Sequence, residues 1–150
     1  MARNNDLGRW GEQCAAKYME EKGWYVRHRN WQKNHHEIDL VCIDEDSTIL
    51  LFIEVKTRAS DKWGQPDESI DLEKKNNLIK AARSYLFDFH LQHIEVRYDT
   101  ISIIGTPETG YEVIHKEGAF NVEDQYEYYR ARKRHRPEKG LWKRGMWRRY

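Results

Sequence analysis

The chain has 150 residues, enough for one domain with a hydrophobic core, although 34% of its residues are charged. Its mean hydropathy of −1.00, with no apolar run near the ~20 residues that span a bilayer, excludes a membrane-spanning helix. The N-terminus lacks the hydrophobic segment of a signal peptide, so we expect a soluble, cytoplasmic protein without membrane partners.

The two cysteines do not form a metal-binding or disulfide pattern. Cys14 and Cys42 lie far apart in the sequence, in a helix-like and a strand-like context, and no CxxC motif occurs. Both are predicted to be small core residues, which excludes a zinc finger and a disulfide scaffold.

Charge is distributed unevenly along the chain. Residues 130–150 contain ten Lys or Arg and one acidic residue, a net charge of +9, whereas residues 1–129 sum to −8. The formal net charge of +1 therefore conceals an acidic body and a strongly basic C-terminal end.

The first predicted elements are a helix and a strand. Apolar residues at helical spacing indicate a helix over residues 6–22, which Gly23 ends. The alternating, aromatic residues 24–31 are typical of a strand. Glu12 lies at the flank of the apolar stripe and is, on this pattern alone, most simply an exposed helix glutamate. His35 and His36 follow in a turn, where we interpret them as loop residues able to contact a substrate.

A hairpin comes next, and it contains the residues that suggest chemistry. Strand-like sequence over residues 38–43 and 49–56 is joined by a polar turn over residues 44–47. Because strand side chains alternate, Glu54 and Lys56 should leave the same face of the second strand. Asp39 on the first strand can lie opposite them if the register allows. The hairpin therefore predicts two carboxylates and a lysine at one end of a sheet.

Two interpretations of this trio are open on these residues alone. Hard cations such as Mg²⁺ bind oxygen ligands and are commonly held by one or two carboxylates together with substrate phosphates, which Asp39 and Glu54 match. Lys56 could then orient the attacking water and stabilise charge on a phosphate. The alternative is a plain cross-strand ion pair of Glu54 and Lys56.

The remaining elements complete a mixed α/β domain. A loop over residues 57–66 precedes a helix that starts at Ser69 or Asp71 and runs to about residue 90. Lys74, in its first turns, either projects toward the candidate site or is solvated. Residues 94–104 and 111–115 are predicted strands. Asp99, within the first of these, is either a structural partner for a basic side chain or a support for the site. The order of elements favours one central sheet with helices.

The C-terminal extension is predicted to be a helix over residues 122–136, capped by Asn121, followed by a segment in which aromatic and basic side chains alternate. Such a segment can bind phosphates with its charges and stack on unpaired bases. The competing interpretations are a solvated, partly disordered tail, or a segment that packs on the acidic body or on a second subunit. The nucleic-acid-binding candidates are Arg58, Lys74, Arg130, Arg132, Lys133, Arg134, Arg136, Trp142, Lys143, Arg144, Trp147, Arg148 and Arg149.

The order of several short motifs supports a family resemblance. The spacing of Asp39, Glu54 and Lys56 resembles the degenerate PD-(D/E)xK nuclease signature, and the wider set of motifs resembles the YraN family of small bacterial proteins, regarded as predicted nucleases distantly similar to archaeal Holliday-junction resolvases. The resemblance covers residues 3–121. Its motifs are Gly11-Glu12, Arg29-Asn30-Trp31, Glu37-Ile38-Asp39-Leu40, Ile53-Glu54-Val55-Lys56-Thr57-Arg58, the helix over residues 74–86, Tyr98-Asp99 and Gly118-Ala119-Phe120.

The resemblance implies a fold and a site. The expected fold is restriction-endonuclease-like, with a mixed central sheet flanked by helices over residues 1–121 and the basic extension over residues 122–150. The implied catalytic residues are Glu12, Asp39, Glu54 and Lys56, with Asp39 and Glu54 as primary ligands of Mg²⁺ or Mn²⁺ and Glu12 as a further one. Glu37 could join Asp39 through its i, i+2 spacing.

Two positions depart from the family pattern. His36 stands where the family usually has glycine, and the basic tail extends past the usual family end, so the role of the tail cannot be inferred from the resemblance.

The implied activity is that of a metal-dependent DNA endonuclease. On branched DNA this activity requires a two-fold homodimer, because two paired cuts need two active sites. A non-catalytic DNA-binding module, or a scaffold whose tail binds another protein, are the alternatives.

Overall fold

The computed structural model describes residues 2–60 and 72–134, with side chains described from residue 5. Three helices and five strands make up this part of the chain. In order they are α1 (Ala2–Glu21), β1 (Tyr25–Lys33), β2 (His36–Ile43), β3 (Ile49–Arg58), α2 (Leu72–Asp88), β4 (Glu95–Thr106), β5 (Gly110–Phe120) and α3 (Val122–Arg134).

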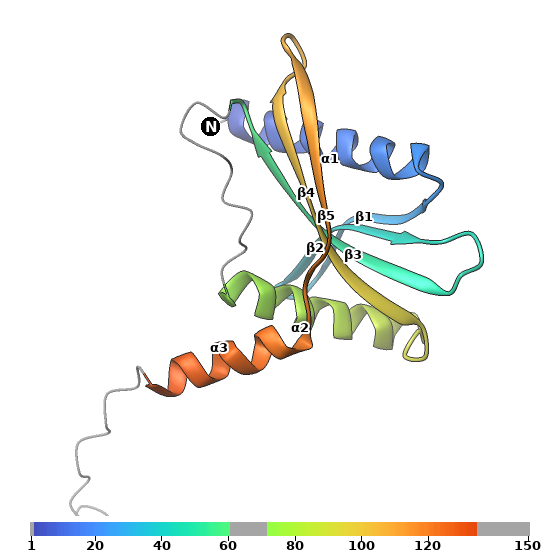
Figure 1. The fold of residues 1–150 in the computed structure, drawn as a ribbon, viewed down its shortest axis with the longest axis vertical. Helices are drawn as coiled ribbons and strands as arrows, with labels where there is room; N and C mark the ends of the chain where they lie inside the picture. The colour runs from blue at the N-terminus through green and yellow to red at the C-terminus, as the bar shows by residue number, and fades with distance from the viewer. Residues whose placement is uncertain (1, 61–71, 135–150) are drawn as a thin grey trace, which may run out of the picture.

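The five strands form one mixed sheet in the order β1-β2-β3-β4-β5. Only β3 and β4 are parallel, and α2 lies between them in sequence, as a crossover connection requires. Figure 1 shows a strongly twisted sheet with α1 on one face and α2, followed by α3, on the other. This architecture confirms the predicted α/β class and is consistent with a restriction-endonuclease-like fold.

Each face of the sheet has its own hydrophobic core. On the α1 side, apolar side chains of the helix pack on alternate residues of the central strands. On the α2 side, Tyr85 and its neighbours cover the other set of residues. The fully buried members are Ala15, Ala16, Met19, Leu40, Cys42, Leu51, Ile53, Ile101 and Ile103 on the α1 side and Ile38, Val41, Leu50, Phe52, Ile79, Ala81, Ala82 and Tyr85 on the α2 side. Cys14 and Cys42 are buried and free, as predicted.

A glycine lets α1 approach the end of β3 closely. A Cβ atom at Gly11 would collide with the Thr57 side chain, including its Cβ, whereas a Cβ atom at Gly8 would meet nothing within 4 Å. Thr57 directly follows Lys56, so this close crossing brings the second and third turns of α1, with Glu12, next to the candidate site.

The predicted boundaries differ from the observed ones mainly at two elements. α1 begins at Ala2 rather than near residue 6, and β5 extends to Phe120 rather than ending at residue 115. The pairing of β4 with β5 shifts between Tyr98 and Thr100, and Gly118 has a left-handed φ of 58°. This irregularity lets the strand continue past residue 115, so that Phe120 pairs with Tyr98. No helix among the described residues is long and apolar enough to cross a membrane.

Candidate functional site

The strands β2 and β3 stop pairing at the position of the two predicted metal ligands. Leu40 and Ile53 are the last paired residues, so Asp39 and Glu54 come next on their respective strands and face each other across the widening gap. The Asp39 Oδ2 atom accepts a hydrogen bond from the Val55 amide, at 2.8 Å. The Asp39 carboxyl group thus accepts the hydrogen bond that a carbonyl oxygen of β2 would accept in a regular sheet. The carboxyl groups of Asp39 and Glu54 are held side by side and share a hydrogen bond.

The faces of β3 follow the predicted alternation. Phe52 packs in the core on the α2 side, whereas Ile53 and Val55 contact the core on the α1 side. Glu54 and Lys56 therefore leave the sheet on the face that α2 covers, as the sequence predicted.

The alternation of β2, in contrast, breaks at Asp39. Ile38 belongs to the core on the α2 side and Leu40 to the core on the α1 side, although residues two apart on a regular strand share a face. On β1, Asn30 lies between the partners of these two residues and has a φ of 48°, a conformation that asparagine tolerates. Asp39 lies at this break and lines a cavity on each side of the sheet. Glu37 and Asp39 nevertheless line the same cavity under α2, so their proximity does not depend on regular alternation.

Two small cavities meet at Asp39, each with a volume of about 220 Å³. The first lies under α2 and contains both carboxylates of the pair, and the second lies beside α1. The first is lined by His35, His36, Glu37, Asp39, Glu54, Lys74, Asn77 and Leu78. The second is lined by Arg9, Glu12, Gln13, Arg29, Asn30 and Asp39. Asp39 is common to both, so Glu12 and Glu54 approach it from opposite sides of the sheet.

The electrostatics of Asp39 and Glu54 favour a bound cation. Burial and the neighbouring Glu54 raise the pKa of Asp39 to about 8, although the hydrogen bond from Val55 opposes the rise. Burial also raises the pKa of Glu54, against the positive charges of Lys74 and Lys56 and a hydrogen bond with the Asp39 carboxyl group. Two like-charged groups kept close together in a half-buried site are costly to ionise unless a positive charge joins them.

Glu12 and Glu37 also lie near Asp39, and their charges affect it less than that of Glu54 does. Their negative charges contribute to the raised pKa of Asp39, and the Glu12 Oε2 atom accepts a hydrogen bond from Asn30 Nδ2 at 2.7 Å. Among residues 2–60 and 72–134, no group of three or more His, Cys, Asp or Glu side chains is arranged to hold a metal ion by itself. The donor set, a carboxylate pair beside a cavity, fits Mg²⁺ or Mn²⁺ completed by water and phosphate oxygens, and does not fit a closed protein cage.

The other predicted site residues fall into three groups. Lys74 lines the first cavity, and Lys56 lies outside that lining but close enough to lower the pKa of Glu54. Arg58 is exposed at the end of β3. Arg130, Arg132, Lys133 and Arg134 are exposed on α3. Arg136, Trp142, Lys143, Arg144, Trp147, Arg148 and Arg149 lie outside the described residues, and their predicted role stays a prediction.

Two polar residues at the site were missed by sequence reasoning. Asn77 lines the cavity one helical turn after Lys74, so its i+3 spacing was an available signal. Asn30 orients Glu12 through its hydrogen bond, and the signal for it is its position in the Arg29-Asn30-Trp31 motif. Neither side chain is charged, and an amide in a strand or helix is more often a surface residue.

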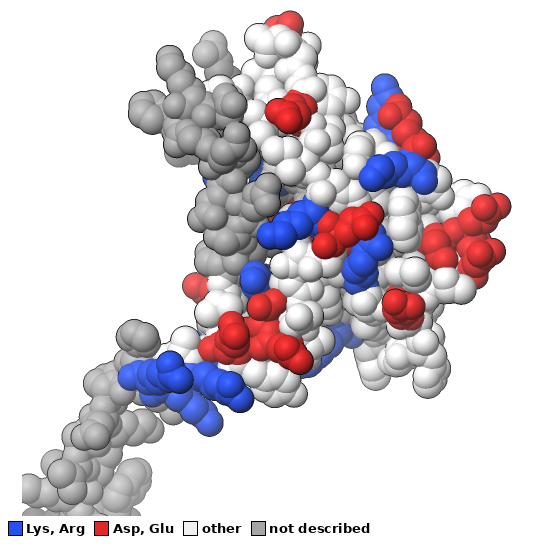
Figure 2. Space-filling view, in the orientation of Figure 1, with Lys and Arg blue, Asp and Glu red and all other residues white. Residues whose placement is uncertain are grey.

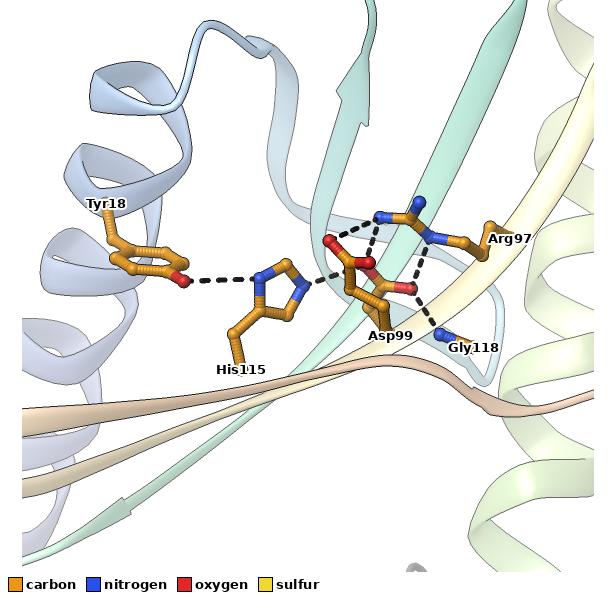
Figure 3. Close-up of polar contacts among 6 residues, drawn as sticks. Tyr18, Arg97, Asp99, His115 and Gly118 are labelled. Atoms are coloured by element: carbon orange, nitrogen blue, oxygen red, sulfur yellow. Dashed lines mark hydrogen bonds and ion pairs between the residues drawn. The ribbon is translucent and has the colours of Figure 1, made fainter.

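A second polar cluster lies on the opposite face of the sheet, centred on the fully buried Asp99 (Figure 3). Its carboxylate accepts hydrogen bonds from Arg97 Nε and Nη2, both at 2.9 Å, from His115 Nε2 at 2.8 Å and from the Gly118 amide at 3.0 Å. The Tyr18 hydroxyl of α1 lies 3.4 Å from His115 Nδ1. Asp99 is thus a structural partner of basic side chains, the first of its two predicted roles.

Metal addition should reverse the pH dependence of stability that Asp39 causes. Folding raises the pKa of Asp39 to about 8, so the folded chain holds this proton more tightly than the unfolded chain does. Without metal, the contribution of Asp39 to the free energy of unfolding is therefore fully present below about pH 4, where the carboxyl group is protonated in both states. This contribution is lost as pH rises toward about 8. We expect thermal unfolding with EDTA to show this loss in the wild type and not in Asp39→Asn. At saturating Mg²⁺ or Mn²⁺, about 100 times the Kd, the wild type should gain about 2.7 kcal/mol, or roughly 5–10 °C in Tm, near neutral pH.

Glu54→Gln should remove most of the gain from metal, because it deletes one of the two carboxylates that would bind the cation. The matched control is Asp88→Asn, which removes an exposed carboxylate that is paired with Lys33 away from the site. An equal metal response of wild type and Glu54→Gln would mean that the cation binds elsewhere.

The fold and the site define the protein as an α/β protein with a mixed five-stranded sheet. A pair of carboxylates lies where its strands β2 and β3 stop pairing. The profile of the uncharacterised protein family UPF0102 matches residues 11–103, and the chain belongs to this family, the YraN family of its sequence motifs. The match spans α1 from Gly11 through most of β4, so it includes every proposed metal ligand.

Bacterial relatives cover between 70% and 81% of the chain. A UPF0102 protein of Bacteroides thetaiotaomicron is 43% identical over 105 residues, which are 70% of this chain and 84% of the relative. The UPF0102 protein of Parabacteroides distasonis is 38% identical over 80% of this chain and 96% of its own length. That of Myxococcus xanthus is 37% identical over 81% of this chain and 94% of its own length. The relatives are described only as UPF0102 proteins, so function has to be argued from the site.

Proposed function

We propose that the protein is a metal-dependent endonuclease that hydrolyses phosphodiester bonds in DNA, with branched DNA as a candidate substrate. The observation that carries this proposal is the Asp39 and Glu54 pair, held side by side where β2 and β3 separate, with Lys56 and Lys74 close enough to lower the pKa of Glu54. Carboxylates that need a cation, beside lysines that can bind phosphate, are the components of metal-assisted phosphodiester hydrolysis.

Each residue of the site has a distinct role in this proposal. Asp39 and Glu54 would hold Mg²⁺ or Mn²⁺, with Glu12 as a further ligand on the α1 side and Glu37 adding negative charge. The cation supplies positive charge beside the phosphodiester. Lys56 would orient the attacking water, whose oxygen bonds to phosphorus as one bridging P–O bond breaks. The attacking water loses a proton to solvent, and the departing oxygen takes up a proton from solvent.

The cavity under α2 offers a place for a neighbouring phosphate. Lys74, His35 of the β1–β2 turn and His36, which begins β2 and is not the predicted loop residue, line its wall. Asn77 can donate a hydrogen bond from the same helix as Lys74. Positive and neutral donors around a small polar cavity suit a phosphate oxygen. Arg58 and the exposed Arg132 and Arg134 of α3 would contact DNA through phosphates and therefore without sequence preference. The basic tail lies outside the described residues, and its contact with DNA stays a prediction.

The proposal is tested by cleavage of a substrate panel. Duplex, single-stranded, flapped and four-way-junction DNA are incubated with the full chain in Mg²⁺, Mn²⁺ or EDTA. We expect nicking of at least one substrate with a metal and none with EDTA. Glu54→Gln, purified in the same way, guards against a contaminating nuclease and should be inactive on every substrate.

A non-catalytic DNA-binding module is the second candidate function. The observation in its favour is that the described residues contain no group of three or more side chains ready to hold a metal ion. Metal-independent binding of DNA, with no cleavage of any substrate in the panel by the wild type, would support the module and reject the endonuclease.

A further inference from the structure

Helix α3 presents a stripe of exposed side chains, of which the described residues of α2 contact only Tyr129, through Lys80. Three of its residues are among the most exposed large hydrophobic side chains of the described chain: Val122 is 41% exposed, Tyr126 62% and Tyr129 42%. With Lys133 they recur at spacings of four, three and four residues, which places them on one side of a helix. An amphipathic stripe of this spacing is the pattern by which helices pack against each other.

The stripe is held in place because α3 is docked firmly on α2 by its other side. Gln125, which is buried, donates a hydrogen bond from Nε2 to Asn76 Oδ1 at 3.0 Å. The Lys75 ammonium lies 3.4 Å from Asp124. These contacts fix the rotation of the helix, so most of the stripe points away from α2, and Tyr129 at its border has the Lys80 ammonium of α2 over its ring, 5.8 Å from the centroid.

The charges along α3 divide into two halves. Glu123, Asp124 and Glu127 lie in the first half, and Arg130, Arg132, Lys133 and Arg134 in the second. Figure 2 shows the basic side chains gathered over the C-terminal half of the helix, with acidic side chains beside its N-terminal half. A helix with one acidic half and one basic half is complementary to a second copy of itself turned end to end.

We propose that α3 is a homodimer interface in which two copies of this chain pack their α3 stripes antiparallel about a two-fold axis. An axis between residues 127 and 128 places Tyr126 against the partner's Tyr129, and the reverse. Glu123 then lies within about 3 Å, along the helix axes, of the partner's Arg130 on the same flank. Two such ion pairs form in each dimer, because the contact is isologous.

A second copy fits this surface better than DNA does. Glu123 and Glu127 lie along the same helix as the tyrosines, so a DNA backbone that followed the whole stripe would meet acidic side chains in its first half. A two-fold copy pairs these acids with bases instead. The surface of a 13-residue helix is at the small end for a specific interface, so we expect a Kd in the micromolar range and weakening by salt.

Charge reversal tests the interface by sedimentation of the full chain, without DNA, from about 1 to 200 µM, a range that brackets a micromolar Kd. Glu123→Lys and Arg130→Glu each create two repulsive pairs per dimer and should weaken dimerisation by on the order of tenfold. The double variant Glu123→Lys with Arg130→Glu recreates both pairs and should dimerise like the wild type. An equimolar mixture of the two single variants should form heterodimers for the same reason.

Two controls separate the interface from loss of the helix. Glu45→Lys makes the same charge change in the exposed β2–β3 turn and should leave dimerisation unchanged. Circular dichroism of Glu123→Lys shows whether a lysine in the first turn has unwound α3. The double variant carries the same lysine, so restored dimerisation in it shows that α3 is still folded.

The inference stands or falls separately from the proposed endonuclease, because no DNA or metal enters the measurement. A wild type that stays monomeric across the concentration range would overturn it. So would a dimer that both single variants leave intact, or single variants that dimerise no better when mixed. Loss of dimerisation in the single variants with recovery in the mixture supports it.

Discussion

Lys56→Ala is expected to reduce metal-dependent DNA cleavage by about 10²- to 10⁴-fold, the usual contribution of a positioned group that manages a proton or orients the nucleophile. Lys56 leaves β3 on the same face as Glu54, and its charge lowers the pKa of that carboxyl group. In the proposed mechanism this places an ammonium group where the attacking water and the phosphate meet. The reduction should appear in the single-turnover rate at saturating protein.

Two comparisons distinguish catalysis from folding or DNA binding. Lys17→Ala removes an exposed lysine of α1, which lies 4.0 Å from Glu21, and should leave cleavage unchanged. Lys56→Ala should keep the wild-type Tm and its affinity for DNA in EDTA. If Lys56→Ala cleaves at the wild-type rate while Lys74→Ala does not, the role assigned to Lys56 belongs to the lysine of α2.

Asp99→Ala is expected to destabilise the protein by about 3–5 kcal/mol, because the buried His115 side chain loses its acceptor and the half-buried Arg97 is left with the exposed Glu117 alone. Asp99 is fully buried and accepts from Arg97, His115 and the Gly118 amide. Burial alone would raise the pKa of Asp99, but the hydrogen bonds from His115 and Arg97 hold it below its usual value on balance. For this 150-residue chain the loss corresponds to a fall in Tm of roughly 6–20 °C.

The effect of Asp99→Ala should depend on pH. A carboxyl group whose pKa is lowered on folding stabilises the protein above its unfolded pKa of about 3.9, and this contribution disappears as pH falls through the folded value. The difference between wild type and variant should therefore be full near neutral pH and shrink below about pH 4. Thermal or urea unfolding at several pH values measures it.

Asp44→Ala is the matched control for the Asp99 variant. Asp44 also accepts backbone hydrogen bonds, from Thr48 and Ile49, but it lies in the exposed β2–β3 turn. Water can replace those contacts, so the expected cost is about 1 kcal/mol. A cost for Asp99→Ala no larger than that of Asp44→Ala would refute a structural role for the buried network.

The sequence by itself determined the elements and much of the site. Helical spacing predicted α1 and α2, and apolar runs with polar turns predicted the β2–β3 hairpin. Alternation along β3 placed Glu54 and Lys56 on one face, because that strand is regular and its period of two is a local property of the backbone. The charge count separated a basic end from an acidic body.

The tertiary structure decided what local periodicity cannot specify. The break in alternation at Asp39 lies opposite the left-handed backbone of Asn30 in the neighbouring strand, and a strand's own sequence does not reveal a partner's irregularity. The Asp99 cluster joins Tyr18 of α1 to His115 of β5, which lie 97 residues apart. The outward stripe of α3 depends on which side of the helix packs on α2 through Gln125. Each of these features arises from contacts between distant segments, whereas sequence patterns report only the preferences of neighbouring residues.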